Sequence, residues 1–279
     1  MVRPLAPEDL AAVVRLLEWM DAEAKRRVLA PEARSGPELA QELESPFVLA
    51  DEDGVYGFVD VFPFWQGAAM LGPVAEVHPG PLLAAAEAKA RELGAETLYA
   101  FPSEENEPLR TALEAAGFAP VHTTHFFLAP PAELGFSPPP GVEIRAPKEF
   151  DPEAYRRVYR EADEGWSLRL SWSDEELAEH FSDPHNRVYF AYEGGEPVGM
   201  VELELLPPLA EVAYLGVVPS HRGRGIGQAL LAHALMEAQK SGVEAVKVRA
   251  HDHEKEALGL YRKLGFRPLE AVVTYAKEL

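Results

Sequence analysis

The carboxyl-terminal half of the chain alternates short apolar stretches with segments in which apolar residues recur at helical spacing. The apolar stretches predict strands at 142–145, 187–192, 197–205, 211–218, 245–249 and 269–276. The helical spacing predicts helices at 152–164, 173–181, 225–240 and 254–264. Ser173, followed by Asp-Glu-Glu, is a typical helix cap with acids in the first turn. Because hairpin-linked strands precede a β-α-β-α-β run, we expect an α/β fold with a mixed sheet.

The amino-terminal half repeats parts of this pattern at a constant distance. "RELGAETLYA" (91–100) resembles "QKSGVEAVKVRA" (239–250), and "LEAAGFAP" (113–120) resembles "YRKLGFRP" (261–268). Gly242 lies 148 residues after Gly94, and Gly265 lies 148 residues after Gly117. A shared offset over such a length indicates an internal duplication. We therefore predict two domains, 1–130 and 142–279, joined by a proline-rich linker at 131–141.

Composition narrows the classes of partner. The 279 residues carry a formal net charge of −20, which disfavours nucleic acid and favours cationic or amine-bearing partners. The chain has no cysteine, so disulfides, thiolate metal sites and a cysteine nucleophile are excluded. No apolar run approaches the roughly 18 residues of a membrane span. Because the first residues do not resemble a secretory signal, we expect a cytoplasmic protein without a membrane partner.

A glycine-rich turn joins a predicted strand to a predicted helix. In "HRGRGIG" the residues run from Arg222 through Gly223, Arg224, Gly225 and Ile226 to Gly227. Glycines allow successive N–H groups to turn toward one centre, and the helix that follows adds its own free N–H groups. Arginine guanidinium groups can bind phosphate oxygens in pairs. These residues predict a cradle for a pyrophosphate, with a spacing unlike that of a P-loop or a dinucleotide fingerprint.

Two segments carry a family resemblance. "VVPSHRGRGIGQALL" and "VRAHDHEKEALGLYRKLGF" resemble the two signature segments of the GNAT superfamily of acyl-CoA-dependent N-acetyltransferases. The resemblance covers the second half of the chain strongly and the first half faintly, so the chain resembles a tandem GNAT protein. It implies acetyl-CoA as co-substrate, with the pyrophosphate bound by the glycine turn. It also implies that the preceding strand binds the pantetheine arm through Leu215, Val217 and Val218.

Two further features of these segments bear on ligands. The family often has an asparagine where this chain has Glu254, which leaves one coenzyme contact open. His251 and His253 share one face of a strand, but no third ligand has informative spacing, and no metal site is predicted. Trp166, Arg169 and Trp172 lie where the family often forms its acceptor wall, and they can equally anchor a loop to the core.

Direct transfer to an amine requires a base, because an ammonium with a pKa of ~10.4 has no lone pair at neutral pH. Glu211 lies eleven residues before Arg222, and the resemblance makes it the preferred base, because GNAT members that use a glutamate base have it at the corresponding place. Strand alternation predicts one face for Glu211, Ala213, Leu215 and Val217. The alternative is that Glu211 opens the strand and faces water. Glu202 and Glu204 are reserve candidates that are otherwise expected at the surface. The resemblance makes Tyr261 the acid at the coenzyme sulfur, whereas its helical spacing alone indicates a core residue.

The first half lacks these features. At the offset of 148 the position of Tyr261 holds Leu113, the position of Glu211 corresponds to Gly67, and the cradle is replaced by His78-Pro79-Gly80. We therefore expect a degenerate, non-catalytic first domain, whose ligands the sequence does not indicate. The predicted function is transfer of acetyl from acetyl-CoA to a primary amine of a small molecule or peptide. The alternative is a non-catalytic acyl-CoA-binding or regulatory module, and neither the acceptor nor the oligomeric state is indicated.

Overall fold

A computed structural model describes residues 1–64, 67–162 and 168–279. The chain divides into two compact units, each of which is discontinuous in sequence. Unit 1 comprises Met1–His125, His251–His253 and Glu270–Leu279. Unit 2 comprises Phe126–Ala250 and Glu254–Leu269. The sequence predicts that each domain is one continuous range. In the structure, however, Glu270–Leu279 belong to unit 1, because the final strand of the chain pairs with a strand of that unit.

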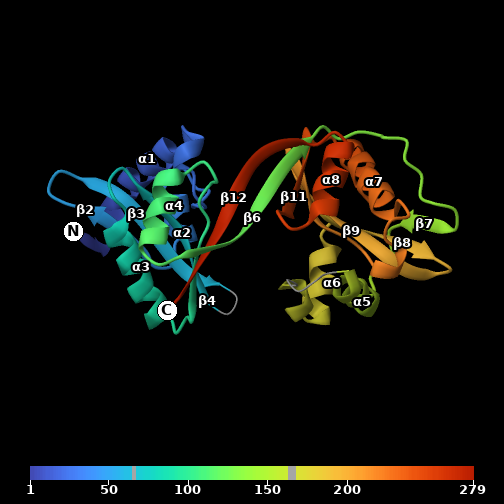
Figure 1. The fold of residues 1–279 in the computed structure, drawn as a ribbon, viewed down its shortest axis with the longest axis horizontal. Coiled ribbons are helices and arrows are strands. Elements are labelled where there is room, and N and C mark those ends of the chain that lie inside the picture. The colour runs from blue at the N-terminus through green and yellow to red at the C-terminus, as the bar shows by residue number, and fades with distance from the viewer. Residues whose placement is uncertain (65–66, 163–167) are drawn as a thin grey trace. The chain divides into compact units, whose positions relative to one another are not determined.

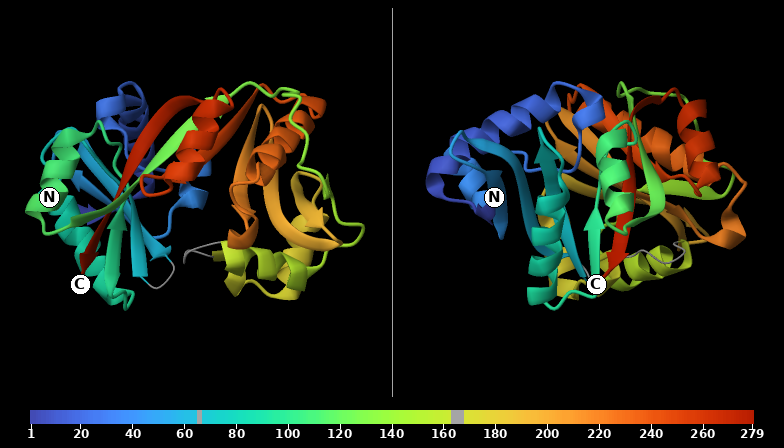
Figure 2. Two further views of the ribbon diagram at one scale, coloured as in Figure 1. Left: turned by 45° about the vertical axis from the view of Figure 1, so that its right-hand side comes forward. Right: turned by 60° about the vertical axis from the view of Figure 1, so that its left-hand side comes forward.

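Unit 1 is a mixed sheet with helices. Its strands are β1 (Val2–Pro4), β2 (Pro46–Ala50), β3 (Val55–Phe64), β4 (Gly67–Ala75), β5 (Thr97–Ala100), the first part of β6 (Ala119–Ala129) and most of β12 (Arg267–Glu278). Its helices are α1 (Leu10–Asp21), α2 (Gly36–Glu42), α3 (Gly80–Glu92) and α4 (Glu107–Ala115). The strand order is β1-β2-β3-β4-β5-β12-β6, with β4 and β5 parallel. The right view of Figure 2 shows the red end of the chain beside β5.

Unit 2 repeats this arrangement. Its strands are the rest of β6, β7 (Val142–Arg145), β8 (Asn186–Glu193), β9 (Glu196–Leu206), β10 (Leu209–Val217) and β11 (Ala245–His251). Its helices are α5 (Pro152–Ala162), α6 (Asp174–Ser182), α7 (Ile226–Lys240) and α8 (Lys255–Lys263). The order is β6-β11-β10-β9-β8-β7, and only β10 and β11 are parallel among the pairings from β7 to β11. Figure 1 shows α5 and α6 on one side of this sheet and α7 and α8 on the other.

The expected α/β class with a mixed sheet is confirmed, and local signals explain where its elements begin and end. The Ser173 hydroxyl accepts a hydrogen bond from the Glu176 N–H at 3.1 Å, and the Glu176 carboxylate accepts one from the Ser173 N–H at 2.6 Å. This reciprocal cap confirms the predicted start of α6. Gly94 and Gly242, which set the repeat distance, have φ of 75° and 74° and end equivalent helices.

Each unit has its own apolar core. In unit 2 the core contains Tyr155, Phe127 and Phe190, none of them more than 2% exposed. In unit 1 it includes Phe58 together with Tyr275 of the final strand, both fully buried. Burial of such large side chains is the main stabilising contribution to each unit. Among the described residues, no helix combines the length and apolar character that a bilayer crossing needs.

Candidate active site

The parallel strands β10 and β11 pair at one end only. Their Cα partners extend from the first residue of each strand to Glu211 and Lys247, whereas β10 continues to Val217 and β11 to His251. Beyond Glu211, β10 keeps its pairing with β9, so the opening lies on the β11 side. In a regular sheet the backbone groups on that side would pair with the next strand. The split therefore leaves an edge of β10 to which an extended ligand can bind.

A bulge in β10 coincides with the split. Between Val212 and Tyr214 the pairing with β9 shifts by one residue, so Ala213 is additional. An additional residue reverses the alternation of all side chains beyond it. The prediction that Glu211, Ala213, Leu215 and Val217 share one face of the strand is therefore wrong.

The two faces of β10 have different neighbours. On one face Tyr159 of α5 stacks on Tyr214, with ring centroids 4.1 Å apart, and the register places Glu211 on this face. On the other face the Val217 Cγ2 lies 3.6 Å from where a Cβ on Gly227 of α7 would stand. Glu211 thus faces the α5 side of the sheet, and the side chain of Val217 faces α7.

Glu211 lies where the two strands separate. Its Oε2 is 2.7 Å from the Nζ of Lys247, its Cα partner on β11. The side chain of Glu211 is 17% exposed and that of Lys247 is 30% exposed, so the pair can be reached from solvent. The predicted base is neither at the open surface nor unpaired. Sequence reasoning missed Lys247, because only the parallel register brings it to Glu211.

The reserve candidates Glu202 and Glu204 lie on β9. Their side chains face the same side of the sheet as the side chain of Glu211 on β10. Glu204 is the Cα partner of Glu211. Glu202 is 1% exposed, and the Tyr155 hydroxyl donates to it at 2.5 Å. The expectation of a surface position is therefore wrong for Glu202, because Tyr155 of α5 covers this part of the sheet.

The glycine turn has the backbone that the cradle requires. Gly223 and Gly225 have φ of 74° and 87°, and no atom lies within 4 Å of a Cβ built on either. The glycines are therefore needed for backbone conformation rather than for room. Gly225 caps α7, and the first intrahelical bond runs from the Ala229 N–H to the Gly225 carbonyl at 3.0 Å. The N–H groups of Ile226 and Gly227 precede that bond and have no partner within the helix.

Backbone groups of β10 beyond the bulge alternate between β9 and the split. The N–H of Val218 donates to the Val198 carbonyl at 3.0 Å. Because successive residues of a strand direct their N–H groups to opposite sides, those of Leu215 and Val217 point into the split. The carbonyl of Val217 accepts a hydrogen bond from Nε of Arg222 at 2.9 Å. Of the three residues expected along the pantetheine arm, Leu215 and Val217 direct N–H groups there and Val218 does not.

Both arginines of the turn have protein partners. Arg222 also donates from Nη2 to the carbonyl of Ala162, at the end of α5, at 2.8 Å. Arg224 binds both carboxylate oxygens of Glu193, at 3.0 and 2.5 Å, and His221 Nε2 lies 3.0 Å from the same carboxylate. The two guanidinium groups that the sequence predicts on a pyrophosphate thus bind protein groups in this structure. Nothing in the local sequence indicates Glu193, because it lies on a different hairpin.

Tyr261 of α8 is buried, as its helical spacing predicts. It is 5% exposed, and its ring packs against Phe127 and Phe266. Its hydroxyl donates to the Arg249 carbonyl on β11 at 3.1 Å. Burial, with a smaller contribution from the charge of Glu254, raises the pKa of the phenol above its ordinary value. The phenol therefore carries its proton at neutral pH.

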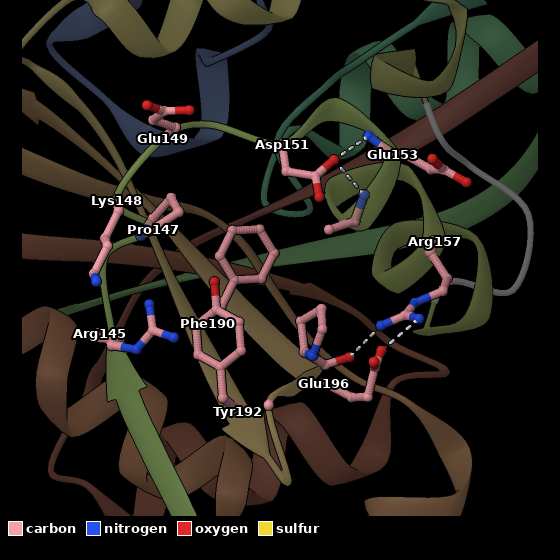
Figure 3. A pocket seen from close by; sticks show the side chains of 13 residues that line it. Arg145, Pro147, Lys148, Glu149, Asp151, Glu153, Arg157, Phe190, Tyr192 and Glu196 are labelled. Atoms are coloured by element: carbon pink, nitrogen blue, oxygen red, sulfur yellow. Dashed lines mark hydrogen bonds and ion pairs between the residues drawn. The ribbon is translucent and has the colours of Figure 1, made fainter.

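A cavity of about 420 Å³ lies elsewhere on unit 2, between the start of α5 and the β8–β9 hairpin (Figure 3). Tyr192 lines it, with the Arg145 guanidinium 4.0 Å above its ring, and Arg157 forms an ion pair with Glu196 across it. No predicted site residue lines this cavity. Adjacent strand residues point to opposite faces, so Glu193 and Tyr192 face different sides of the hairpin.

Several known proteins resemble this chain in sequence. The profile of the acetyltransferase (GNAT) family matches residues 153–266. A mycothiol acetyltransferase of Thermomonospora curvata is 29% identical over 94% of this chain and 93% of its own length. The N-alpha-acetyltransferase RimI of Mycobacterium tuberculosis is 36% identical over 34% of this chain and 61% of its own length.

Two solved structures have the same fold along the whole chain. A GCN5-related N-acetyltransferase from Sphaerobacter thermophilus matches with a TM-score of 0.78 and 22% identity, covering 100% of this chain and 95% of its own. A tandem GNAT protein from the clavulanic acid biosynthesis pathway matches with a TM-score of 0.68 and 18% identity, covering 100% and 98%. Residues 153–266, most of unit 2, thus match the GNAT family, and the whole chain has the fold of a tandem GNAT protein. The family match and the names of the relatives support an acetyl-CoA-dependent acyltransferase, in agreement with the resemblance seen in the sequence.

The residues of this site fit the coenzyme that the GNAT family uses. The split between β10 and β11 runs to the glycine turn, and both present backbone N–H groups that lack a strand or helix partner. No atom fills the space beside Gly223 and Gly225 where side chains would stand in other residues. An extended arm ending in a diphosphate requires such an arrangement.

Equivalent helices of the two units begin differently. Asn106 caps α4 by accepting a hydrogen bond from the Leu109 N–H at 3.2 Å. Glu254, at the equivalent place, makes no such cap on α8.

His251, one of the two histidines that the sequence singles out, has a protein partner. Its Nδ1 lies 3.0 Å from the Thr124 hydroxyl. Within the described ranges, no three His, Cys, Asp or Glu side chains are grouped to hold a metal ion.

The structure describes only part of the expected acceptor wall. Trp166 and the side chain of Arg169 lie outside the described residues. Trp172 packs against the unit 2 core, and its carbonyl accepts a hydrogen bond from Arg156 at 2.7 Å. The anchoring alternative therefore holds for Trp172.

Proposed function

We propose that unit 2 transfers an acetyl group from acetyl-CoA directly to a primary amine of a small molecule or a peptide. The observation that supports this most is that β10 and β11 separate at Glu211, with the split ending at the glycine turn. A carboxylate thus stands at one end of the proposed coenzyme channel, and a set of N–H donors stands at the other.

The residues along the split have distinct proposed tasks. The N–H groups of Gly223 to Gly227 hold the pyrophosphate, helped by the positive end of the α7 dipole. The N–H groups of Leu215 and Val217 hold the pantetheine arm in the manner of an added strand. When bound, acetyl-CoA supplies the activated acetyl group as a thioester.

Glu211 is the proposed base. A lysine-like ammonium has a pKa of ~10.4, and a carboxylate beside it can accept its proton as the amine reacts. In the structure the Lys247 ammonium already occupies a hydrogen-bonding position on this carboxylate. An acceptor ammonium can bind the remaining oxygen of Glu211 in the same way, which brings the amine to the place where the strands part.

Tyr261 is the proposed acid. Its raised pKa keeps the phenol protonated but makes full proton transfer to a thiolate of pKa ~8.5 unfavourable. Its contribution is therefore a hydrogen bond to the departing sulfur, made with the hydrogen that contacts the Arg249 carbonyl in this structure. This predicts a smaller catalytic contribution than that of Glu211.

Two relatives support the two acceptor classes. One is called a mycothiol acetyltransferase and aligns along 94% of the chain, and the other is called an N-alpha-acetyltransferase and aligns along 34% of it. We therefore retain small-molecule amines, including a mycothiol-related one, together with peptide amines. The net charge of −20 favours acceptors that are cationic.

Unit 1 is proposed to be non-catalytic. At the position corresponding to Glu211, a Cβ on Gly67 would stand 2.4 Å from the Thr97 carbonyl oxygen, so a larger residue does not fit there. At the place of the cradle, the His78 ring nitrogen accepts the Gly80 N–H at 3.1 Å at the start of α3. A side chain thus occupies one donor that a phosphate would need.

The test combines binding and kinetics. Calorimetry of the whole chain with coenzyme A should give one equivalent bound, and acetyl-CoA with an amine panel should release free thiol. Glu211→Gln should lower kcat by about 10²- to 10⁴-fold without loss of coenzyme affinity, because it removes the base. Tyr261→Phe should lower kcat on the order of tenfold.

Glu237→Gln is the matched control. Glu237 has a side chain 16% exposed and a lysine at 2.7 Å, which closely resembles the environment of Glu211, and it lies near the far end of α7 from the cradle. Its replacement should leave kcat unchanged. Coenzyme binding without thiol release for any amine would favour the alternative of a non-catalytic acyl-CoA-binding module.

A further inference from the structure

The two arginines of the glycine turn hold it to different parts of unit 2. Arg222 donates to the carbonyls of Val217 and Ala162, which attaches the start of the turn to β10 and α5. Arg224 extends to the β8–β9 hairpin, where its guanidinium binds Glu193 through two nitrogens. The backbone between these attachments contains Gly223, which has a left-handed conformation.

Glu193 contacts the turn on both sides of that glycine. Its carboxylate lies 3.0 Å from His221 Nε2 and 2.5 Å from Arg224 Nη2. Glu193 is the last residue of β8 and pairs with Glu196 across the hairpin, so its backbone is fixed by the sheet. One side chain on a rigid strand thus restrains two residues of a flexible segment.

This contact has a local effect rather than a global one. The side chains of Glu193 and Arg224 are 30% and 40% exposed, and ion pairs that are so exposed contribute little to the stability of a fold. A turn with two left-handed glycines has many alternative conformations when it is not restrained. Restraining it before a ligand arrives lowers the entropy lost on binding. The effect of the contact should therefore be seen in ligand affinity.

We propose that Glu193 is a positioning residue for the cradle: by holding Arg224 and His221 it keeps the N–H groups of the Gly223–Gly225 bend directed toward the diphosphate of the coenzyme. The proposal rests on the proposed function, since it assumes that the cradle binds this diphosphate. Arg224 then acts mainly as an attachment of the turn, and the backbone provides the main contacts to the phosphate oxygens.

The direction in which removal of Glu193 changes ligand affinity distinguishes this role from the opposite one. If Glu193 positions the turn, its removal weakens binding of every ligand that carries the diphosphate. If Glu193 instead withholds Arg224 from the phosphate, its removal frees the guanidinium and tightens binding, because a negative charge near the diphosphate is also lost. The two effects have opposite directions on the same measured constant.

The experiment measures the dissociation constant of coenzyme A by calorimetry. The dissociation constant of S-acetylpantetheine is measured by its competition with bound coenzyme A. S-acetylpantetheine has the arm and the thioester but no diphosphate. Glu193→Ala and Arg224→Ala should each raise the dissociation constant of coenzyme A about tenfold, and the double variant should be no weaker than either single one. The constant for S-acetylpantetheine should not change. Glu193→Asp should restore part of the affinity.

Glu196 lies on the same hairpin as Glu193, but its side chain forms an ion pair with Arg157 of α5 at the cavity of Figure 3. Glu196→Ala, which breaks that ion pair, is therefore the matched control. It should leave coenzyme affinity unchanged. Tighter or unchanged coenzyme binding in Glu193→Ala would overturn the positioning role, as would an equal loss for S-acetylpantetheine. A wild-type chain that binds no coenzyme A would instead refute the proposed function. Melting temperatures identify any variant that fails to fold, and Glu193→Gln then replaces Glu193→Ala, with an expected loss of affinity in the same direction.

Discussion

Gly225 occupies the last position before α7 with φ of 87° and ψ of 4°. Residues with a Cβ reach this conformation at a cost of about 1–2 kcal/mol. Gly227, two residues later, is inside the helix, where a Cβ would stand 3.6 Å from Val217 in ordinary contact. The two glycines of the motif therefore have different physical reasons to be there, although they look alike in the sequence.

Alanine substitutions separate these reasons. Gly225→Ala should lower the free energy of unfolding by about 1–2 kcal/mol, because the left-handed backbone is strained by a Cβ. Gly227→Ala should keep or raise stability by up to roughly 1 kcal/mol, because alanine is the better helix former. Urea unfolding of both variants tests this. Equal losses in the two would contradict the assigned conformations.

At the scale of elements, short segments are held by single polar contacts. In unit 1 the three-residue strand β1 is joined to the turn before α1 by Arg3, whose guanidinium binds both oxygens of Asp9 at 2.6 and 2.8 Å. Asp9 is 5% exposed and also accepts the Ala6 N–H at 2.8 Å. The hydrogen bond from Arg3 is the main cause that lowers the pKa of Asp9, against the opposing effect of burial.

A lowered pKa makes this contact dependent on pH. The carboxylate stabilises the folded state above the pKa that Asp9 has in the unfolded chain, and this stability is lost as the pH falls through its lower folded value. Asp9→Asn should therefore reduce the free energy of unfolding at pH 7 by about 1–3 kcal/mol. The difference in the free energy of unfolding between wild type and Asp9→Asn should shrink as the pH falls through the folded pKa of Asp9.

Chemical denaturation between pH 7 and pH 3 measures this difference. The exposed Asp53 provides a control, because Asp53→Asn removes a carboxylate without such a buried contact. A pH-independent difference between wild type and Asp9→Asn would show that the ionisation of Asp9 does not contribute.

At the scale of the whole molecule, the end of the chain completes the first unit. Residues Glu270–Leu279 group with unit 1, and β12 pairs antiparallel with β5 from Tyr275 with Ala100 to Glu278 with Thr97. Tyr275 is fully buried in the unit 1 core, and its hydroxyl donates to Glu114 at 2.7 Å. A unit whose sheet needs a strand from the far end of the chain can be complete only when the whole chain is present.

Truncation of this tyrosine tests the assignment. Tyr275→Ala should destabilise unit 1 by about 3–5 kcal/mol, as expected for removal of a large buried aromatic ring. Hydrogen exchange followed by peptide should show the loss of protection in β2 to β5 rather than in β8 to β10. Tyr275→Phe keeps the ring and should lose only about 1 kcal/mol. A loss of protection confined to unit 2 would contradict the strand assignment.

Local sequence determined most elements of unit 2. The alternation at 187–192 became β8 at Asn186–Glu193, the helical spacing at 225–240 became α7 at Ile226–Lys240, and Ser173 caps α6 as predicted. Periodicity and caps depend on neighbours within a few residues, so they can be read without a fold. The glycine turn and the family resemblance also depend on contiguous residues, for the same reason.

The tertiary structure decided what depends on residues distant in sequence. The bulge at Ala213 follows from pairing with β9 and reverses the face predicted for Leu215 and Val217. Lys247 meets Glu211 only through parallel pairing, and Glu193 meets Arg224 only because two hairpin strands end beside the turn. The unit to which β12 belongs is likewise set by its partner β5, since an apolar strand pattern does not specify the strand with which it pairs.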